Sequence, residues 1–593
     1  MTSEAPRVSS FRTLCDAFVA TSTRVPDSLA LRTPKDGVTL TWRLYAARVR
    51  TIAAGLAGLG VQRGDTVGIM LTNRPEFHLV DTAALCVGAT PFSVYNTLTA
   101  DQITHLFNNA GTRVVVCEEQ FVDKVKAAAA ASKVEHIVCV DAAPTGTMAL
   151  ADLERAPAES FDFDASWRAV QPEDVATIIY TSGTTGAPKG VELTHASLLA
   201  ELEALEDVTQ VTERDKVVSY LPDAHIANRW GAHYTSLATG LQITTVADTK
   251  QLIAALPDTR PTFFGAVPQI WYKIKTAIES AIAAEPSTPK RRLAEWSISV
   301  GRQRARTLSD GKSVSPVLAA QHAIADRLVL SKLRAKLGLD QVRFAASGAA
   351  AIAPEALEFI LGLGIPCCEC WGMSEISAVG IINPADAIRI GTVGKALKNV
   401  ELRIADDGEL LVRGPLLMKG YRDEPEKTAE TIDADGWLHT GDIATIDADG
   451  YVRIVDRKKE LIINAAGKNM SPANIESAIR AYCPLVGSAV AIGDDRPFVV
   501  ALLTLDPDAA AAFAARSGIT STDLANDPAV KAAVEAGIAE ANEHLARVEQ
   551  IKKSTLLPDA WEPGGDEITP TMKLKRRPIA EKYAAQIEAL YAR

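Results

Sequence analysis

The residues best suited to chemistry lie in one loop, Tyr180-Thr-Ser-Gly-Thr-Thr-Gly-Ala-Pro-Lys-Gly190. Its three glycines allow backbone N–H groups to approach a ligand closely, and successive N–H groups in a turn can surround an anion. Further hydrogen-bond donors and one positive charge come from Thr181, Ser182, Thr184, Thr185 and Lys189. The pattern predicts a loop that holds the triphosphate of a nucleotide.

A loop of this composition can also be a flexible linker. The apolar run Val175–Ile179 before it predicts a buried strand, and Val191-Glu-Leu-Thr-His195 after it resembles the start of a helix, which disfavours a linker. The loop is also not a Walker A loop, because Pro188 stands where that pattern has its second glycine. We therefore expect a phosphate-binding loop of another class.

The composition is that of a soluble globular protein with more than one domain. The chain has 593 residues, and one hydrophobic core rarely serves more than about 250–300 residues. Apolar residues make up 47% and charged residues 23% of the chain, which is ordinary for such proteins. The net charge of −11 argues against general binding of nucleic acid.

Eight cysteines are scattered along the chain, several of them inside apolar runs, such as Cys86, Cys117 and Cys139. This distribution favours reduced thiols in a cytosolic protein over a disulfide framework. The run Cys367-Cys368-Glu369-Cys370 lacks the separated pairs of a zinc site, so we expect no metal there.

Two further patterns concern location. No apolar run reaches the roughly 18 residues that a membrane span needs, and Met1 to Ser10 lacks the basic-then-apolar pattern of a signal peptide. We therefore expect a cytoplasmic protein. Peripheral contact with the inner face of the membrane stays open.

Helical and strand patterns alternate through the first several hundred residues, which favours an α/β fold. Apolar residues recur at helical spacing from Tyr45 to Leu59, and Asp65–Leu71 reads as a strand. Strand patterns at Val114–Val116 and His136–Val140 flank a helix pattern at Lys124–Ala131. This order predicts a parallel sheet with crossover helices.

The pattern changes twice later in the chain. Residues 272–340 are mostly helical and contain a basic stretch from Lys290 to Arg306, which is either a solvated helical face or a surface for anionic lipid headgroups or a phosphate-bearing cosubstrate. After residue 400, short strands alternate with Asp/Gly turns, and the charged run Asp456-Arg-Lys-Lys459 separates two strand patterns. We expect a large N-terminal domain, 1–457, with parallel-rich sheets, and a small α+β domain, 458–593.

Together with the loop, five further segments resemble the adenylate-forming superfamily, and within it the long-chain fatty acyl-CoA synthetases. Each segment is weak evidence alone, but all occur in the family's order and the resemblance extends from about Leu40 to Arg577. The segments are Leu221-Pro-Asp-Ala-His225, Ser347-Gly-Ala-Ala350, Glu369-Cys-Trp-Gly-Met-Ser-Glu375, Thr440-Gly-Asp442 with Asp456-Arg457, and Thr569-Pro-Thr-Met-Lys573.

The resemblance implies an ATP site. Trp371 would stack on adenine, where the family usually has tyrosine. Ser374 would bond the α-phosphate, and Asp442 would accept hydrogen bonds from the ribose hydroxyls. The full implied nucleotide site comprises Thr181, Ser182, Gly183, Thr184, Thr185, Gly186, Lys189, Gly348, Ala349, Ala350, Trp371, Gly372, Ser374, Asp442 and Arg457.

The resemblance also assigns the catalytic residues, which are Lys573, Glu375, Lys189 and Thr185. Glu375 would hold Mg²⁺ together with substrate phosphates, since Mg²⁺ prefers such oxygen ligands. Lys573 would bridge the carboxylate of the acid and the α-phosphate. The family often has glycine before this lysine, whereas this chain has Met572.

Further roles follow from the same resemblance. Lys459 would be the hinge of a mobile C-terminal domain, and Gly467 would lie on the strand that approaches the coenzyme A channel. The acyl pocket would include His225, Phe264, Gly265 and Val267. Gln269 stands where the family often has arginine, so no charge is expected there.

The implied reaction is the ATP-dependent ligation of a fatty acid, long-chain by resemblance, to coenzyme A. It would proceed through an acyl-adenylate with Mg²⁺ as cofactor and release AMP and pyrophosphate. Two alternatives stay open: a fatty acyl-AMP ligase that passes the acyl group to a carrier protein, and a catalytically inactive nucleotide-binding regulatory protein. Intact Lys189, Glu375 and Lys573 argue against the latter. Oligomeric state and the type of acid stay open.

Overall fold

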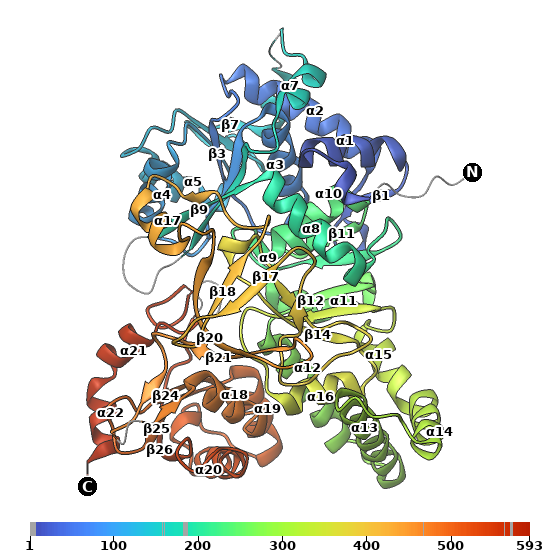
Figure 1. The fold of residues 1–593 in the computed structure, drawn as a ribbon, viewed down its shortest axis with the longest axis vertical. Coiled ribbons are helices and arrows are strands. Elements are labelled where there is room, and N and C mark those ends of the chain that lie inside the picture. The colour runs from blue at the N-terminus through green and yellow to red at the C-terminus, as the bar shows by residue number, and fades with distance from the viewer. Residues whose placement is uncertain are drawn as a thin grey trace.

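A computed structural model describes residues 7–156, 158, 160–181, 188–465, 468–562, 564–569 and 573–592. The chain forms a mixed α/β structure, as predicted. Sheets and flanking helices build the large N-terminal part, and a small α+β part, red in Figure 1, lies beside the yellow and green segments.

A five-stranded parallel sheet with the order β4-β3-β5-β6-β7 forms the layer farthest from the C-terminal part (Figure 1). The elements expected between residues 45 and 140 are confirmed in type and in position to within a few residues. They and their neighbours are α1 (Leu14–Arg24), α2 (Trp42–Gly58), β3 (Thr66–Met70), α3 (Pro75–Val87), β4 (Thr90–Ser93), α4 (Ala100–Ala110), β5 (Val114–Cys117), α5 (Val122–Ala129), β6 (His136–Cys139), β7 (Met148–Ala149), α6 (Leu150–Arg155) and α7 (Phe163–Ala169).

Two more sheets form the middle of the molecule, with the orders β10-β11-β1-β2 and β12-β13-β14-β15-β16. Strands β12, β13 and β14 are parallel. Because the carboxyl ends of parallel strands meet at one edge, this sheet brings Val267, Gly348 and Gly372 together. The strands are β1 (Leu29–Arg32), β2 (Thr39–Thr41), β10 (Lys216–Ser219), β11 (Gln242–Thr245), β12 (Phe263–Ala266), β13 (Phe344–Ser347), β14 (Cys367–Trp371), β15 (Ile381–Ile382) and β16 (Lys395–Ala396).

The predicted phosphate loop lies at the tip of a hairpin between β8 (Val175–Thr181) and β9 (Lys189–Thr194), in which Thr181 pairs with Lys189. The residues between them, 182–187, lie outside the described part. Residues 191–194 were expected to start a helix but belong to β9, because Val191 and Leu193 alternate into the core. Helix α8 (His195–Thr209) follows, and Thr194 caps it by accepting from the N–H of Ser197.

An antiparallel sheet, β17-β18-β20-β21, follows in the chain. It pairs Asp442 on β20 directly with Arg457 at the end of β21. Strand β19 instead joins the hairpin of β8 and β9 by pairing with β9. The elements are β17 (Glu401–Ile404), β18 (Glu409–Arg413), β19 (Gly420–Tyr421), α17 (Pro425–Thr431), β20 (Leu438–Ile446) and β21 (Val452–Arg457).

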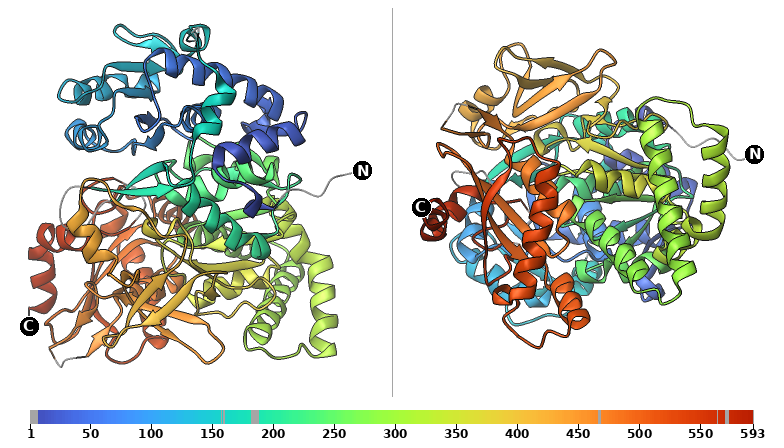
Figure 2. Two further views of the ribbon diagram at one scale, coloured as in Figure 1. Left: turned by 45° about the horizontal axis from the view of Figure 1, so that its top comes forward. Right: turned by 90° about the horizontal axis from the view of Figure 1, so that it is seen from below.

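The helical region expected at residues 272–340 projects from the N-terminal part on the side away from the C-terminus (Figures 1 and 2). Helix α13 crosses α16 at close range, since a Cβ on Gly301 would lie 2.1 Å from the carbonyl oxygen of Gly362. No helix in the described ranges is long and apolar enough to cross a membrane. The helices are α11 (Leu252–Thr259), α12 (Pro268–Ala283), α13 (Thr288–Ser309), α14 (Pro316–Ala325), the π-helix η6 (Asp326–Leu330), α15 (Ser331–Leu337) and α16 (Pro354–Gly362).

The C-terminal part has its own core around the sheet β24-β25-β26. Helix α18 joins it to the rest of the molecule, because Ala481 packs in a core cluster of the N-terminal part and the Ser477 hydroxyl donates to the carbonyl of Ala351. The elements are β22 (Ile462–Ile463), β23 (Asn469–Met470), α18 (Pro472–Tyr482), β24 (Val486–Ile492), β25 (Val499–Leu505), α19 (Pro507–Ser517), α20 (Pro528–Glu543), β26 (Ile551–Leu556), α21 (Arg576–Lys582) and α22 (Ala584–Tyr591).

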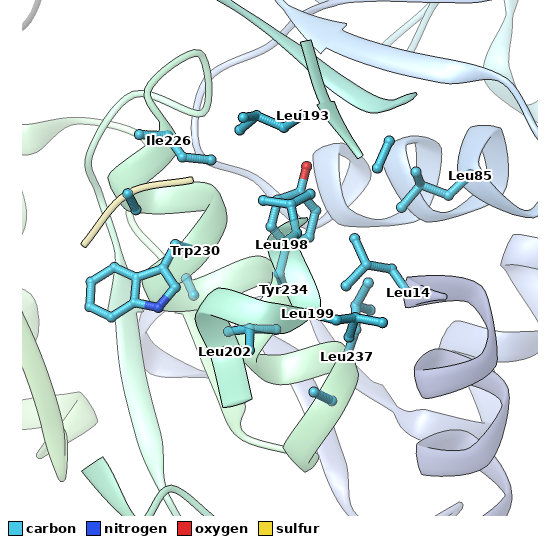
Figure 3. Close-up of a cluster of buried hydrophobic side chains, with 14 of the residues drawn as sticks. Leu14, Leu85, Leu193, Leu198, Leu199, Leu202, Ile226, Trp230, Tyr234 and Leu237 are labelled. Atoms are coloured by element: carbon cyan, nitrogen blue, oxygen red, sulfur yellow. The ribbon is translucent and has the colours of Figure 1, made fainter. Parts of the chain in front are cut away.

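The largest core cluster connects the N-terminal sheets through helices. Figure 3 shows the part where Leu14, Leu85 and the leucines of α8 surround Tyr234. Ile226 and Trp230 belong to this cluster and also face the large cavity described below. They come from α9 (Ile226–Asn228) and the π-helix η4 (Arg229–Tyr234), which α10 (Thr235–Thr239) follows. The core therefore supports one wall of the cavity directly.

Candidate active site

One cavity of about 2190 Å³ lies between the N-terminal sheets and the C-terminal part. Most of the predicted site residues in the described ranges line it: Thr181, Lys189, His225, Gly265, Val267, Gly348, Ala349, Ala350, Trp371, Gly372, Ser374, Glu375, Asp442, Arg457, Lys459 and Lys573. The predictions for Ser182, Gly183, Thr184, Thr185, Gly186 and Gly467 fall outside the described residues. Residues that lie hundreds of positions apart in sequence thus share one space.

The lysine of the phosphate loop is placed by an aromatic ring. The Lys189 Nζ lies 4.4 Å from the ring centroid of Tyr421, and the Tyr421 hydroxyl donates to Glu375 Oε1 at 2.8 Å. Tyr421 reaches this position because β19 pairs with β9 beside the loop. The cluster holds a cation and a carboxylate side by side, as binding of a magnesium–phosphate complex requires.

Asp442 joins two other predicted residues. The indole Nε1–H of Trp371 donates to Asp442 Oδ2 at 2.8 Å, and Arg457 Nε lies 2.8 Å from Asp442 Oδ1. Burial raises the pKa of Asp442, while the Arg457 charge and the Trp371 hydrogen bond oppose the rise. Each carboxylate oxygen can accept more than one hydrogen bond, so Asp442 can bind ribose hydroxyls with both partners in place.

The backbone beside Trp371 is unusually close-packed. A Cβ on Gly372 would lie 1.6 Å from the carbonyl oxygen of Ala378, so only glycine fits there. On the neighbouring strand end, Ala349 has a φ of 67°, in the left-handed region that non-glycine residues rarely adopt. Strained backbone of this kind concentrates at functional sites, and here it lines the nucleotide side of the cavity.

Lys573 comes from the C-terminal part and faces the same charges. Two hydrogen bonds with Thr569 fix its backbone: the Thr569 N–H donates to the Lys573 carbonyl, and the Lys573 N–H donates to Thr569 Oγ1. Its side chain is accessible to the water in the cavity, yet the surrounding protein desolvates its charge. This desolvation and the positive Arg457 lower the pKa of Lys573, whereas Asp442 and Glu375 oppose the shift.

The segment between the two parts is held by backbone hydrogen bonds on both sides of Lys459. The Lys458 N–H donates to the Gly441 carbonyl, and its Nζ lies 3.2 Å from Glu409. Immediately after Lys459, the N–H groups of Glu460 and Leu461 turn back to the Arg457 carbonyl. Lys459 itself is exposed, shortly after the end of β21 and before the first strand of the C-terminal part.

The far end of the cavity is mostly apolar. Its walls include Gly265, Val267 and the segment His225–Ala232. A Cβ on Gly265 would meet no atom within 4 Å, so the strand leaves space there. His225 accepts from the N–H of Ala227, and burial, together with the charge of Lys573, lowers the pKa of His225 to about 4. His225 is therefore neutral at pH 7.

The acyl-pocket prediction for Phe264 does not agree with its position. Phe264 is fully buried in the core behind the sheet, where it packs against Tyr220 and Trp271. The preceding residue, Phe263, lines the cavity instead. Successive side chains of a strand point to opposite faces, so β12 presents Phe263 and Gly265 to the cavity and turns Phe264 away.

A buried polar network anchors the wall formed by η4. The Asp81 carboxylate on α3 lies 2.5 Å from Arg229 and 3.0 Å from His233, and both residues belong to η4. Arg229 also donates to the Ser93 and Tyr234 hydroxyls. Charges this deeply buried are stable only when paired and hydrogen-bonded, so the network fixes the backbone of the wall residues Trp230 to Ala232.

The donor set at Glu375 fits Mg²⁺. One buried carboxylate, held by the Tyr421 hydroxyl, faces the cavity, and the same tyrosine ring contacts Lys189. Among the described residues, no group of three or more His, Cys, Asp or Glu side chains forms a metal site. This arrangement suits an ion that takes one protein carboxylate and completes its shell with phosphate oxygens and water.

Family comparisons agree with this geometry. Residues 18–422 match the family described as AMP-binding enzyme, and residues 459–593 match the AMP-binding enzyme C-terminal domain.

The chain belongs to the AMP-binding enzyme family.

Two relatives are mycobacterial. This AMP-binding enzyme is 56% identical over 450 residues to the putative fatty-acid–CoA ligase fadD11 of Mycobacterium tuberculosis, which covers 75% of the chain and 79% of the relative. It is 36% identical over 590 residues to the long-chain-fatty-acid–CoA ligase FadD15 of Mycobacterium bovis, which covers 95% of each chain. The superfamily resemblance predicted from the motifs is confirmed.

Solved structures share the fold. The anthranilate CoA ligase AuaEII in complex with anthranoyl-AMP has a TM-score of 0.74 at 18% identity and covers 98% of this chain and 100% of its own. ATP-bound MatB from Rhodopseudomonas palustris has a TM-score of 0.69 at 24% identity and covers 96% and 99%. The predicted fold class, a large N-terminal and a small C-terminal domain, is confirmed.

The motifs did not reveal two residues of the site. Tyr421 lies in a two-residue strand outside every motif, and only its pairing with β9 brings it to Glu375. Glu369 belongs to a quoted segment but received no role. It lines the cavity beside Trp371, and burial raises its pKa to about 8. An unusual pKa in a cleft marks a functional candidate.

We expect Tyr421→Phe to weaken the binding of Mg²⁺–ATP about tenfold, because a hydrogen bond to a charged group contributes about 1.5 kcal/mol. Isothermal titration calorimetry measures the affinity. Tyr451→Phe is the matched control, since its hydroxyl donates to the Ala387 carbonyl away from the cavity. Equal affinities for the wild type and Tyr421→Phe would remove the positioning role of Tyr421.

We expect Glu369→Gln to stabilise the protein at alkaline pH. A carboxyl whose pKa rises on folding, here from 4.5 to about 8, favours the folded state when protonated, and this advantage is lost as pH rises from 4.5 toward 8. The variant should therefore melt at a higher temperature than the wild type at pH 8.5 and show a smaller difference at pH 5. A pH-independent difference in differential scanning fluorimetry would contradict the assignment.

Proposed function

We propose that this AMP-binding enzyme is an ATP-dependent long-chain fatty acid–CoA ligase. It activates the carboxylate of the acid as an acyl-adenylate, releases pyrophosphate, and transfers the acyl group to coenzyme A with release of AMP. The observation that carries the proposal is one cavity, which Lys573, Glu375 and Asp442 line together with apolar residues such as Phe263, Val267 and Trp230. The names of both mycobacterial relatives support the same activity.

The first half-reaction needs positive charge where negative charge accumulates. The acid's carboxylate attacks the α-phosphorus of ATP, the bond to pyrophosphate breaks, and two anions meet in the process. Lys573 neutralises the approaching oxygens from the C-terminal side, and Lys189 holds the departing phosphates beside Tyr421. Fixed cations of this kind act without reorganisation during the reaction. When bound, Mg²⁺ neutralises phosphate charge at Glu375.

Asp442 and Trp371 set the position of the nucleotide. We propose that Asp442 binds the ribose hydroxyls while Trp371 and Arg457 fix the rotamer of its carboxylate. Trp371 then has two roles, since its ring lines the cavity and its N–H holds Asp442. Ser374 and the residues Gly348 to Ala350 are proposed to lie next to the adenosine monophosphate group, where their small side chains leave room for it.

The second half-reaction needs a different arrangement. Lys573 occupies the side of the cavity from which a thiol would have to approach, so the C-terminal part must move before coenzyme A reacts. We propose Lys459 as the pivot between residues 1–457 and 458–593, because the last hydrogen bond to β20 ends at Lys458. Gly467 is proposed as the residue that then lines the channel for the thiol arm.

The acid is proposed to occupy the apolar end of the cavity. Phe263, Gly265 and Trp230 offer apolar surface, and neutral His225 adds no charge that would bind the carboxylate away from Lys573. The open space at Gly265 supports a bulky or extended chain. Fatty acids partition into lipid, and we propose that the enzyme works in the cytoplasm with peripheral contact to the inner face of the membrane.

A panel of carboxylic acids from short to very long tests the function. With ATP, Mg²⁺ and coenzyme A, long-chain acids should give acyl-CoA, AMP and pyrophosphate in equal amounts. Thioester formation with a carrier protein but not with coenzyme A would identify an acyl-AMP ligase instead. Absence of pyrophosphate with every acid would identify an inactive nucleotide-binding protein.

We expect Lys573→Ala to lose acid-dependent pyrophosphate release about 100-fold, the usual effect of removing one charge-stabilising group. The same variant should still convert supplied acyl-adenylate into acyl-CoA, because that step does not use Lys573. The control is Lys552→Ala, which removes an exposed lysine on β26 outside the cavity. Normal adenylation by Lys573→Ala would disprove its role.

We expect Lys459→Pro to keep adenylation and to lose thioester formation, because proline fixes φ at the pivot and restricts the preceding residue. Lys459→Ala should retain both half-reactions, since alanine leaves the backbone free to rotate. Separate assays of pyrophosphate release and of thioester formation from acyl-adenylate distinguish the steps. Equal loss of both in Lys459→Pro would remove the hinge assignment.

A further inference from the structure

Exposed apolar side chains gather on the outermost helices of the N-terminal part. Twelve large apolar side chains are exposed among the described residues, and five of them lie between residues 293 and 328. We call this group the outer helical surface, and it consists of Leu293, Leu308, Val317, Ile324 and Leu328. Figures 1 and 2 show α13 and α14 at the edge of the molecule, away from the C-terminal part.

Helix α14 is apolar on two faces. Its inner face packs through Leu318 and Ala325, which are 6% and 0% exposed. Its outer face carries Val317 and Ile324, which are 68% and 53% exposed although they lie seven residues apart on the same side. Leu328 extends this stripe into η6. A helix that faced only water would carry polar residues there, and Pro316–Ala325 contains no Asp, Glu, Lys or Arg.

The same region is strongly basic. Residues 288–337 contain eleven Lys and Arg but only three Asp and Glu, a net charge of +8 in a chain whose total is −11. Some of these cations form ion pairs within the protein, such as Arg302 and Arg306 with Glu358. Exposed lysines and arginines outside these two ion pairs are Lys290, Arg292, Arg327, Lys332 and Lys336.

Apolar side chains surrounded by cations match an anionic lipid surface. Apolar groups enter the acyl boundary of a bilayer while Lys and Arg remain at the headgroups, and each cation near an anionic leaflet strengthens binding about fivefold. A solvated face does not explain the outward Val317 and Ile324. A second copy of this chain docked through the same surface would bring two patches of net charge +8 together, and like charges repel.

We propose that the outer helical surface docks this enzyme on an anionic membrane, with Val317, Ile324 and Leu328 inserted between headgroups. The proposal names the surface for the peripheral contact that the proposed function invokes. The proposal is based on the exposed apolar side chains and the positive charge of residues 288–337, and on no property of the active site. It can therefore be tested without ATP, acid or coenzyme A, and its failure is distinguishable from failure of the ligase function.

Flotation of the full-length protein with vesicles tests the docking surface. We expect binding to vesicles that contain phosphatidylglycerol, weaker binding to pure phosphatidylcholine, and loss of binding as salt rises from about 0.05 to about 0.5 M, since salt screens the cations. V317E/I324E should lower the partition coefficient at least tenfold. V38E/V548E is the matched control, because Val38 and Val548 are 42% and 45% exposed and lie outside the outer helical surface. This variant should bind vesicles as the wild type does.

Ligation of a long-chain fatty acid presented in detergent micelles, without vesicles, should be equal in the wild type and both variants, which excludes misfolding. Wild-type binding by V317E/I324E would overturn the proposal, as would a wild type that ligates but binds no vesicles. Light scattering, which measures the oligomeric state, tests whether a second copy of this chain occupies the surface instead. If V317E/I324E dissociates a dimer without changing vesicle binding, the surface is an interface between copies and the lipid proposal is wrong.

Discussion

The carboxylate of Asp442 is the interaction on which the arrangement of the site depends. It is buried at the junction of the central sheets, and it is held by an indole N–H from β14 and a guanidinium from β21. An isolated buried carboxylate would be costly, so the partners are required for stability as well as for function. Because Arg457 ends the last strand of the N-terminal part, the residue that stabilises Asp442 also begins the segment that leads to the domain carrying Lys573.

This connection explains how one cavity can serve two steps. We propose that Lys573 cannot occupy the nucleotide site and leave room for a thiol at the same time, and Lys573 lies on a part of the chain with its own core. The contacts that hold the two parts together include the hydrogen bond from Ser477 to Ala351 and the packing of Ala481 in a core cluster of the N-terminal part. The apolar wall around Trp230 is fixed in contrast by the deeply buried Asp81–Arg229 pair. In the proposed mechanism the acid meets a pocket fixed by this pair, whereas Lys573 moves with the C-terminal part.

Much of the fold could be predicted from the sequence, because strong local patterns govern it. The apolar run Asp65–Leu71 predicts a buried strand from its own sequence, and it forms β3. The segments around Trp371 and Asp442 contain enough distinctive residues for the family's motifs to be recognised. Other features depend on tertiary pairing. Tyr421 reaches Glu375 only through a two-residue strand that adds to β9. Phe263 and Phe264 are identical in type, so only the register of β12 decides which one faces the cavity. Residues 191–194 were misread because a short apolar alternation before a helix can belong to either element.

We propose that an organic acid is activated as its AMP ester where Lys573, Glu375 and Asp442 meet. The decisive experiment is the exchange of labelled pyrophosphate into ATP, measured without coenzyme A. We expect exchange only when a fatty acid is present, and its loss when Asp442 is replaced by alanine. Formation of ADP and phosphate instead, or thioester synthesis without any exchange, would show that the acid is not activated as an AMP ester.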